Sequence, residues 1–241
     1  VRDCESFDYL MKLGLESSAI EVVPDPVMGV SLEGQAVNET PSDVRVIGVS
    51  VRHWNNDRSD LDAVAEALVR LIANVQVEIR FLPFHLPGDL EASEYVIRQM
   101  KERMKTSGSR HGEHAFPGNK YAGEPAINII KADGHPEKLI REVAACDLLV
   151  GMRLHSLIYA ANRGVPFIGI SYDPKIDHFL RRFELKAAFA TGYPDAEALH
   201  REMEQGLNEG KQWMSEHETL IKALQQLARV PAQQICQKLR I

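Results

Sequence analysis

The stretch Gly151–Lys175 carries three side chains whose chemistry differs from that of their surroundings. Its sequence, GMRLHSLIYAANRGVPFIGISYDPK, is mostly apolar, yet Arg153, His155 and Lys175 stand at the points where the chain turns. Arg and Lys bind phosphates and carboxylates, and His can take up or release a proton near neutral pH. Together these residue types suit a small anionic substrate that undergoes proton transfer.

The elements that must position these side chains alternate along the chain. Apolar, β-branched runs predict strands at 44–51, 77–84, 127–131, 147–152 and 166–172, and helical spacing predicts helices at 60–73, 91–104, 136–145, 156–162 and 176–183. Strands that alternate with helices predict an α/β fold with a doubly wound, mostly parallel sheet. The residues beyond Asp195 predict a helical tail that reaches to about Leu239.

Ligands of such sheets bind outside the carboxyl ends of the strands. Arg52 follows the first strand of the regular region, Arg153 and His155 follow the fourth, and Lys175 follows the fifth. The predicted helix from Ser156 begins at the same rim, where its free N–H groups favour an anion. With Arg2, which follows a strand remnant at the N-terminus, the candidate site residues are Arg2, Arg52, Arg153, His155, Ser156 and Lys175.

Each candidate also has a plain structural interpretation. An Arg at a strand end usually forms an ion pair or faces solvent, a His at a helix start usually caps it, and a Lys in a DPK turn needs no further role. The formal net charge of the chain is −6, so the cations gather here against the overall balance. Pattern alone leaves the two interpretations level, and the functional one predicts a multiply charged ligand such as a phosphorylated carboxylate.

Two regions differ in character along the 241 residues. Residues 1–30 predict a strand end, a helix at about 6–13 and a short strand at 20–23, which we interpret as the remnant of an N-terminal Rossmann-like domain. Residues 31–43 are polar and predict a linker, and residues 44–241 predict a C-terminal Rossmann-like domain with its tail. Because the chain opens at Val1 without Met, we expect a preceding segment to be missing, by truncation or by disorder.

Composition argues against several classes of protein. The negative charge opposes binding to nucleic acid, and no apolar run reaches the roughly 18 residues of a membrane helix. Cys4, Cys146 and Cys236 lack metal-ligand spacing and predict free thiols in a cytoplasmic protein. HGEH at 111–114 is a weak metal motif that favours a surface loop, so we predict no metal site. The glycine motifs of dinucleotide and mononucleotide sites are absent.

The two tryptophans invite different interpretations. Trp54 lies beside Arg52 in VRHW and could stack on a sugar ring. For Trp213, packing of the C-terminal helix is the simpler expectation.

The segment GMRLHSLIYAANRGVPFIGISYDPK resembles the signature of the polysaccharide pyruvyl transferase family, in particular its CsaB-type bacterial cell-wall enzymes. VRDCESFDYLMKLGL with DPVM resembles the segment that joins the two domains of that family, and VIGVSVRHW resembles the start of its second domain. The resemblance runs from Val1 to about Phe183. It implies a GT-B-like pair of Rossmann-like domains, of which the first would be mostly missing here.

The resemblance also implies an activity. Family members transfer the enolpyruvyl-derived unit of phosphoenolpyruvate to two hydroxyls of one sugar, often N-acetylmannosamine of a lipid-linked cell-wall precursor, and form a 4,6-pyruvate ketal. Phosphoenolpyruvate is the donor, no cofactor is implied, and the acceptor lipid implies peripheral contact with the inner face of the membrane. Matching positions imply catalytic roles for His155 and Lys175 and substrate binding by Arg2 and Arg153.

Two other functions stay open. A GT-B glycosyltransferase with a nucleotide sugar shares the architecture, with Glu184 or Asp177 as weak candidates for a ribose contact. A non-catalytic binding domain is the third, because acceptor sites of two-domain enzymes usually draw on both domains.

Overall fold

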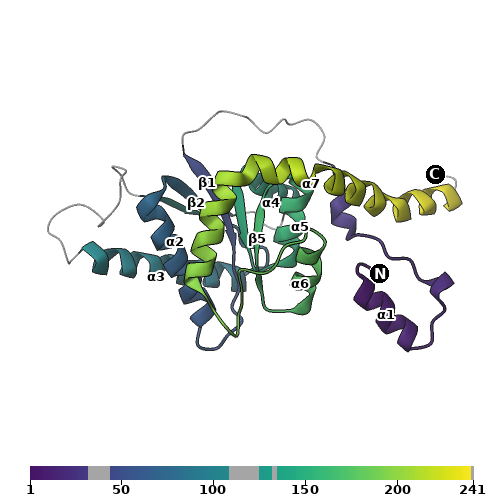
Figure 1. The fold of residues 1–241 in the computed structure, drawn as a ribbon, viewed down its shortest axis with the longest axis horizontal. Coiled ribbons are helices and arrows are strands. Elements are labelled where there is room, and N and C mark those ends of the chain that lie inside the picture. The colour runs from purple at the N-terminus through teal and green to yellow at the C-terminus, as the bar shows by residue number, and fades with distance from the viewer. Residues whose placement is uncertain (32–43, 109–124, 132–134, 240–241) are drawn as a thin grey trace.

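The computed structural model describes residues 1–31, 44–108, 125–131 and 135–239, and all structural statements concern these residues (Figure 1). Most of the expected linker at 31–43 and the HGEH motif at 111–114 lie outside this part of the chain. The described residues form an α/β body with an N-terminal segment that lies along one side of it and packs on α5 and α7.

The body is built on one parallel sheet. Its strands are β1 (Arg45–Ser50), β2 (Val77–Phe81), β3 (Ala126–Ile129), β4 (Leu148–Gly151), β5 (Phe167–Ser171) and β6 (Phe189–Ala190). They lie in the order β3-β2-β1-β4-β5-β6, and every pair is parallel. The predicted doubly wound sheet is therefore confirmed, with the order of a Rossmann fold. The two-residue strand β6 was not predicted, because so short a run leaves no periodic pattern.

Helices cover both faces of the sheet. They are α2 (Ser59–Asn74), α3 (Gly88–Gly108), α4 (Pro136–Ala144), α5 (Leu154–Arg163), α6 (Pro174–Arg181) and α7 (Ala196–Leu239). The buried side chains of α2, α3 and the start of α7 share one core cluster, and those of α4, α5, α6 and the later part of α7 share the other. Over the described residues, no helix combines the length and apolar character that a membrane span requires.

The central strands are buried on both faces. All residues of β4 and β5 are buried, which explains why they read as continuous apolar runs rather than as alternating ones. The turn from β4 into α5 is tight: a Cβ on Gly151 would lie 2.8 Å from Leu157 Cδ2. Glycine at this position therefore lets α5 begin directly above the end of the strand.

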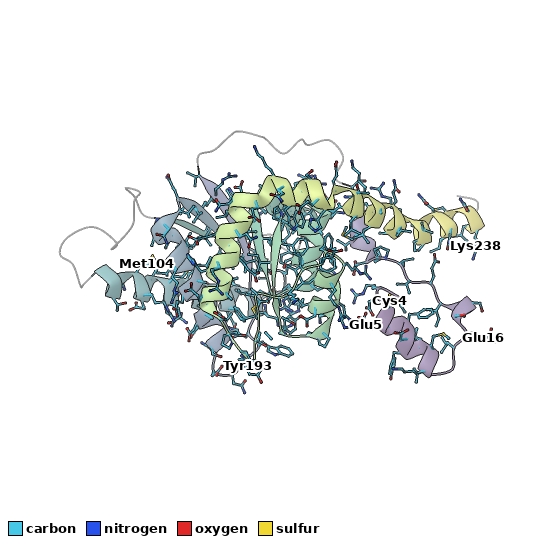
Figure 2. The ribbon with its side chains drawn as sticks, viewed as in Figure 1. Cys4, Glu5, Glu16, Met104, Tyr193 and Lys238 are labelled. Atoms are coloured by element: carbon cyan, nitrogen blue, oxygen red, sulfur yellow. The ribbon has the colours of Figure 1, made fainter. Side chains whose placement is uncertain are left out.

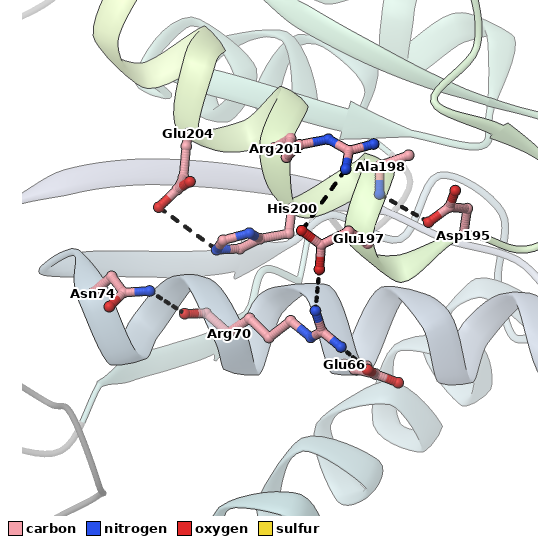
Figure 3. Close-up of polar contacts among 9 residues, drawn as sticks. All are labelled: Glu66, Arg70, Asn74, Asp195, Glu197, Ala198, His200, Arg201 and Glu204. Carbon is pink, nitrogen blue, oxygen red and sulfur yellow. Dashed lines mark hydrogen bonds and ion pairs between the residues drawn. The ribbon is translucent and has the colours of Figure 1, made fainter.

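The tail α7 begins on α2 (Figure 3). Asp195 Oδ1 accepts a hydrogen bond from the Ala198 N–H at 2.9 Å, which caps the new helix. Arg70 of α2 pairs with both Glu66 and Glu197. Exposed ion pairs of this kind contribute at most about 1 kcal/mol, so the buried side chains of α7 hold it to the body. These are Leu199, Met203, Leu207, Ile221, Leu224 and Ala228.

The N-terminal segment contains α1 (Cys4–Lys12) and two short 3₁₀ helices, η1 (Ser17–Ala19) and η2 (Pro26–Gly29). The expected strand at 20–23 is not formed, and Val1 only exchanges backbone hydrogen bonds with Glu21 and Val23. A strand needs a longer ladder of partners, and Pro24 ends this one. Figure 2 places Cys4, Glu5 and Glu16 on this segment, below the end of α7 that carries Lys238.

Candidate active site

A cleft of about 660 Å³ opens where the sequence predicts a ligand site, at the carboxyl ends of the strands. Loops after β1, β2, β3, β4 and β5 all contribute to its walls. Seven Arg, Lys and His side chains line it, and among the described residues no Asp or Glu does. These seven are Arg2, Arg52, His85, Lys131, Arg153, His155 and Lys175. The chain is acidic overall, yet an anion in the cleft would meet basic side chains on several of its walls.

The cleft brings together five of the six candidates that the sequence identifies: Arg2, Arg52, Arg153, His155 and Lys175. Ser156 is the exception, because it is fully buried and its hydroxyl donates to the Arg153 carbonyl at 2.6 Å. Helix α5 begins at Leu154 rather than at Ser156, so the Ser156 side chain lies inside the first turn. It stabilises the turn that carries Arg153 and His155 and does not line the cleft.

Arg153 is held by a residue that the sequence analysis did not identify. Its Nε lies 3.0 Å from Asp89 Oδ2, and its Nη2 donates to Asp89 Oδ1. Asp89 is fully buried, and its Oδ2 also accepts the N–H groups of Phe84 and His85 at 3.1 and 2.9 Å. This forked ion pair fixes the guanidinium plane. It occupies Nε and one edge of Nη2, so Nη1 and the free edge of Nη2 are the donors left for a ligand.

His155 and Arg2 meet at a second buried carboxylate, that of Asp25. Arg2 Nη1 donates to Asp25 Oδ2 at 2.7 Å, and His155 Nε2 lies 3.8 Å from the same oxygen. Both side chains stay about half exposed, at 49 % for Arg2 and 52 % for His155. Arg182 donates to the Arg2 carbonyl and thereby ties the segment to the body.

Lys175 belongs to a cluster of basic side chains and aromatic rings at the ends of β1 and β5, which also contains Arg52, Trp54 and Tyr172. Its Nζ lies 3.1 Å from Asp173 Oδ2 and 5.3 Å from the centre of the Tyr172 ring. The Arg52 guanidinium lies 4.6 Å from the Tyr172 ring centre and 5.1 Å from that of Trp54. Trp54 does not line the cleft, but it is 47 % exposed, so part of its indole is accessible beside Arg52 and Tyr172, which do line it.

The remaining candidates have structural explanations. Trp213 packs against Phe167, Phe183 and His217, as expected for a helix-packing residue. Asp177 accepts a hydrogen bond from Ser171 at 2.7 Å. Neither of these residues, nor Glu184, lines the cleft.

The three cysteines are free thiols. Burial raises the pKa of the Cys146 thiol to about 12, so it stays protonated at neutral pH. A protonated thiol is a poor nucleophile, and Cys146 therefore offers no covalent chemistry.

One group of described side chains has the geometry of a metal site, namely Asp3, Glu5 and His178. Each has protein partners already. Asp3 caps α1 through the Ser6 N–H, and Glu5 pairs with both Arg181 and His178. The group lies at the joint between α1 and α6 and is explained by holding these helices together.

A model of the polysaccharide pyruvyl transferase family matches residues 1–174. The chain belongs to this family. The match includes Arg2, Arg52, Arg153 and His155 and ends one residue before Lys175. No match to the chain is found among curated protein sequences.

Solved structures resemble this family member in fold. A putative UDP-N-acetylglucosamine 2-epimerase from Listeria monocytogenes superposes with a TM-score of 0.57 at 12 % identity, over 88 % of this chain and 50 % of its own. The UDP-GlcNAc 2-epimerase of Methanocaldococcus jannaschii, solved with UDP-GlcNAc and UDP, gives 0.56 at 16 % identity, over 86 % of this chain and 53 % of its own. Anabaena Alr3699/HepE, solved with UDP and glucose, gives 0.53 at 13 %, over 100 % and 62 %.

At these identities the likeness shows the fold alone. It is the Rossmann-like fold of GT-B enzymes, with a helical C-terminal tail. The chain spans roughly half to three fifths of the length of these relatives.

Proposed function

We propose that this protein transfers the enolpyruvyl-derived group of phosphoenolpyruvate to a sugar and releases phosphate. One observation carries the proposal: in a chain of this family, Arg2, Arg153, His155 and Lys175 line one cleft that no described carboxylate lines. A three-carbon phosphorylated carboxylate presents two anionic groups, which Arg forks and a Lys ammonium suit. The cleft is larger than such a donor needs, which leaves room for an acceptor sugar.

Each of these four side chains has a role in the proposed reaction. Carbon 3 of phosphoenolpyruvate takes up a proton, and carbon 2 becomes an electrophile. A sugar hydroxyl attacks carbon 2 and loses its proton, phosphate leaves with its oxygen, and a second hydroxyl of the same sugar closes the ketal and loses its own proton. His155 acts as the acid or base in these steps. Arg153 and Arg2 bind the carboxylate and phosphate, and Lys175 binds the phosphate or protonates it as it leaves.

We further propose the acceptor that the CsaB-type resemblance implies. It is N-acetylmannosamine of a lipid-linked cell-wall precursor, and the product is a 4,6-pyruvate ketal. Such an acceptor would bring a cytoplasmic enzyme to the inner face of the cell membrane.

The test follows two products in parallel. Phosphate release is measured with phosphoenolpyruvate and an N-acetylmannosamine-containing disaccharide, and UDP release is measured with UDP-sugars. Phosphate release that depends on the acceptor supports the ketal-forming transferase. UDP release without phosphate release supports a glycosyltransferase that uses a nucleotide sugar, the second candidate, because GT-B enzymes share this fold. Binding of phosphoenolpyruvate without turnover on any acceptor supports a binding domain, and failure to bind it contradicts the proposal.

Trp54 is the group that we assign to the acceptor sugar. Its exposed indole contacts Arg52 and Tyr172, which line the cleft, and extends the surface that they form. We expect Trp54→Ala to raise the KM for the acceptor about two- to tenfold, the equivalent of about 0.5–1.5 kcal/mol of aromatic contact. The KM for phosphoenolpyruvate should stay unchanged, and Trp54→Phe should retain most of the acceptor affinity. An unchanged acceptor KM in Trp54→Ala would remove Trp54 from the site.

The exposed apolar side chains support the expectation of a second domain. Helix α1 buries none of its residues, and ten large exposed hydrophobic residues gather on the N-terminal segment and the end of α7. These are Val1, Tyr9, Met11, Leu13, Leu15, Val22, Val30, Leu227, Ile235 and Leu239. Apolar surface concentrated in this way usually marks an interface. We propose that it packs against a second α/β domain of the enzyme.

Hydrogen exchange tests the second domain. We expect the α1 amides to exchange slowly in the longest natural form of the protein and rapidly in the 241-residue chain alone. Equal exchange in both forms would contradict the proposal. Protection that rises with protein concentration in the 241-residue chain would instead indicate a second copy of this chain at the surface.

A further inference from the structure

We infer that Asp25 is the positioning residue of this site. Its carboxylate holds Arg2 and His155 in one constellation and determines which ring nitrogen of His155 exchanges the proton. Oδ2 accepts from Arg2 Nη1 at 2.7 Å and lies 3.8 Å from His155 Nε2, while Oδ1 accepts the Val27 N–H at 3.1 Å. The inference deepens the proposed function, and its spectroscopic test does not depend on turnover.

Burial makes this carboxylate an effective anchor. Asp25 is 9 % exposed and does not line the cleft, whereas the side chains of Arg2 and His155 are about half exposed and do line it. A carboxylate that is nearly withdrawn from water needs cationic or hydrogen-bonding partners, and its field is poorly screened. Tyr159 lines the cleft, and its pKa is raised first by burial and second by the negative charge of Asp25. The electrostatic field of Asp25 therefore extends to the cleft wall.

The geometry selects one tautomer of His155. A carboxylate that faces one ring nitrogen of a neutral imidazole keeps the proton there, and the other nitrogen carries the free lone pair. Asp25 faces Nε2, so Nδ1 is the nitrogen that exchanges a proton with substrate. The 3.8 Å separation is longer than a hydrogen bond, as catalytic contacts commonly are before substrate binds.

A purely structural role for Asp25 is the alternative, because Asp25 belongs to the N-terminal segment. That segment has other anchors on the body. Asn162 Nδ2 donates to the carbonyls of Met28 at 2.7 Å and of Val27 and Val30 at 3.3 Å, Met28 is 1 % exposed, and Arg229 donates to the Gly29 carbonyl at 3.0 Å. Since these contacts attach the segment without the Asp25 side chain, its placement against His155 is better explained by the site.

Two measurements on the full natural chain test the inference, with Asp25→Ala as the variant. In ¹⁵N-histidine spectra at pH 8, the His155 signals, assigned by their loss in His155→Gln, should show the proton on Nε2 in the unsubstituted protein. They should shift toward the mixed tautomers of a free imidazole in Asp25→Ala. With phosphoenolpyruvate and the acceptor, kcat should fall about 10²-fold in Asp25→Ala, the lower end of what general acid–base catalysis contributes.

Two further variants separate positioning from attachment. Asp25→Asn keeps the shape of the side chain and an oxygen that can face Nε2. This variant should therefore preserve the tautomer of His155, and it should fold even if Asp25→Ala does not. Asn162→Ala weakens the attachment of the same segment without touching Arg2 or His155, and it should leave both the tautomer and kcat close to those of the unsubstituted protein. The inference is overturned if the His155 spectrum is unchanged in Asp25→Ala, or if Asn162→Ala lowers kcat as much. A protein that turns over no phosphoenolpyruvate but shows the tautomer shift would overturn the proposed function and keep the role of Asp25.

Discussion

His155→Ala is expected to lower kcat by about 10²–10⁴-fold, the usual contribution of general acid–base catalysis. Binding of phosphoenolpyruvate should remain nearly unchanged, because Arg2, Arg153 and Lys175 still line the cleft. The side chain of His155 is 52 % exposed, so its removal leaves no buried cavity and should barely alter the free energy of unfolding. The measurements are phosphate release under saturating acceptor and calorimetric titration of phosphoenolpyruvate into the variant.

His85→Ala is the matched control for this prediction. His85 lines the same cleft, but it lies on the loop after β2, where its backbone N–H donates to Asp89 at 2.9 Å. Removing its side chain keeps that hydrogen bond and should leave kcat within a few-fold of the original value. Normal turnover in His155→Ala, or a larger loss in His85→Ala, would show that another group transfers the proton.

Asp89→Ala is expected to cost about 3–5 kcal/mol of unfolding free energy, the usual result of removing one partner of a buried ion pair. The loss has two parts. The Arg153 guanidinium, whose side chain is only 21 % exposed, loses its counter-charge, and the N–H groups of Phe84 and His85 lose their acceptor. The low end of the range is the better expectation, because the open cleft admits water to Arg153. Urea unfolding with an unchanged m-value measures this cost.

Asp147→Ala provides the comparison. Asp147 also accepts from one Arg and one backbone N–H, those of Arg45 at 2.9 Å and Val46 at 2.7 Å, but its side chain is 33 % exposed. An exposed pair contributes only about 0–1 kcal/mol, so Asp147→Ala should destabilise the protein far less than Asp89→Ala does. Equal losses in the two variants would show that the Asp89–Arg153 pair is not the anchor that its burial indicates.

The Asp89–Arg153 pair also alters what is expected of Arg153 as a ligand. The sequence predicts that Arg153 binds substrate at a strand end and identifies no partner for it. In the structure its Nε and one edge of Nη2 are committed to Asp89, so it approaches a ligand in a fixed orientation and with fewer donors. An Arg that is already oriented loses less conformational freedom when it binds an anion, which favours a precise contact with the carboxylate or phosphate.

The alternation of strands and helices was readable from the sequence because local chemistry encodes it. Buried parallel strands must be apolar on both faces, and the helices that cover them must be apolar on one. Strands β1, β4 and β5 therefore appear in the sequence as short continuous apolar runs, and α2 appears as apolar residues at helical spacing. The location of the ligand site followed from the fold class, because parallel strands bring their carboxyl ends to one edge of the sheet. Arg2, Arg52, Arg153, His155 and Lys175 were identified by that rule, and the family was identified by short motifs within residues 1–174, which the family model matches.

Other features depend on contacts between distant parts of the chain. The Asp89–Arg153 pair joins residues 64 positions apart, and Asp25 meets His155 only because the N-terminal segment packs on α5 and α7. No local pattern marks an Asp as the partner of a residue so far along the chain. Ser156 illustrates the opposite case: α5 begins two residues earlier than its periodicity indicated, which turned a predicted ligand contact into a buried hydroxyl. The sequence by itself thus determined the sheet, its rim and the cationic residues along it, because these follow from periodicity and strand direction. Only the tertiary structure decided which carboxylates orient those cations, because burial and pairing arise when segments far apart in the chain meet.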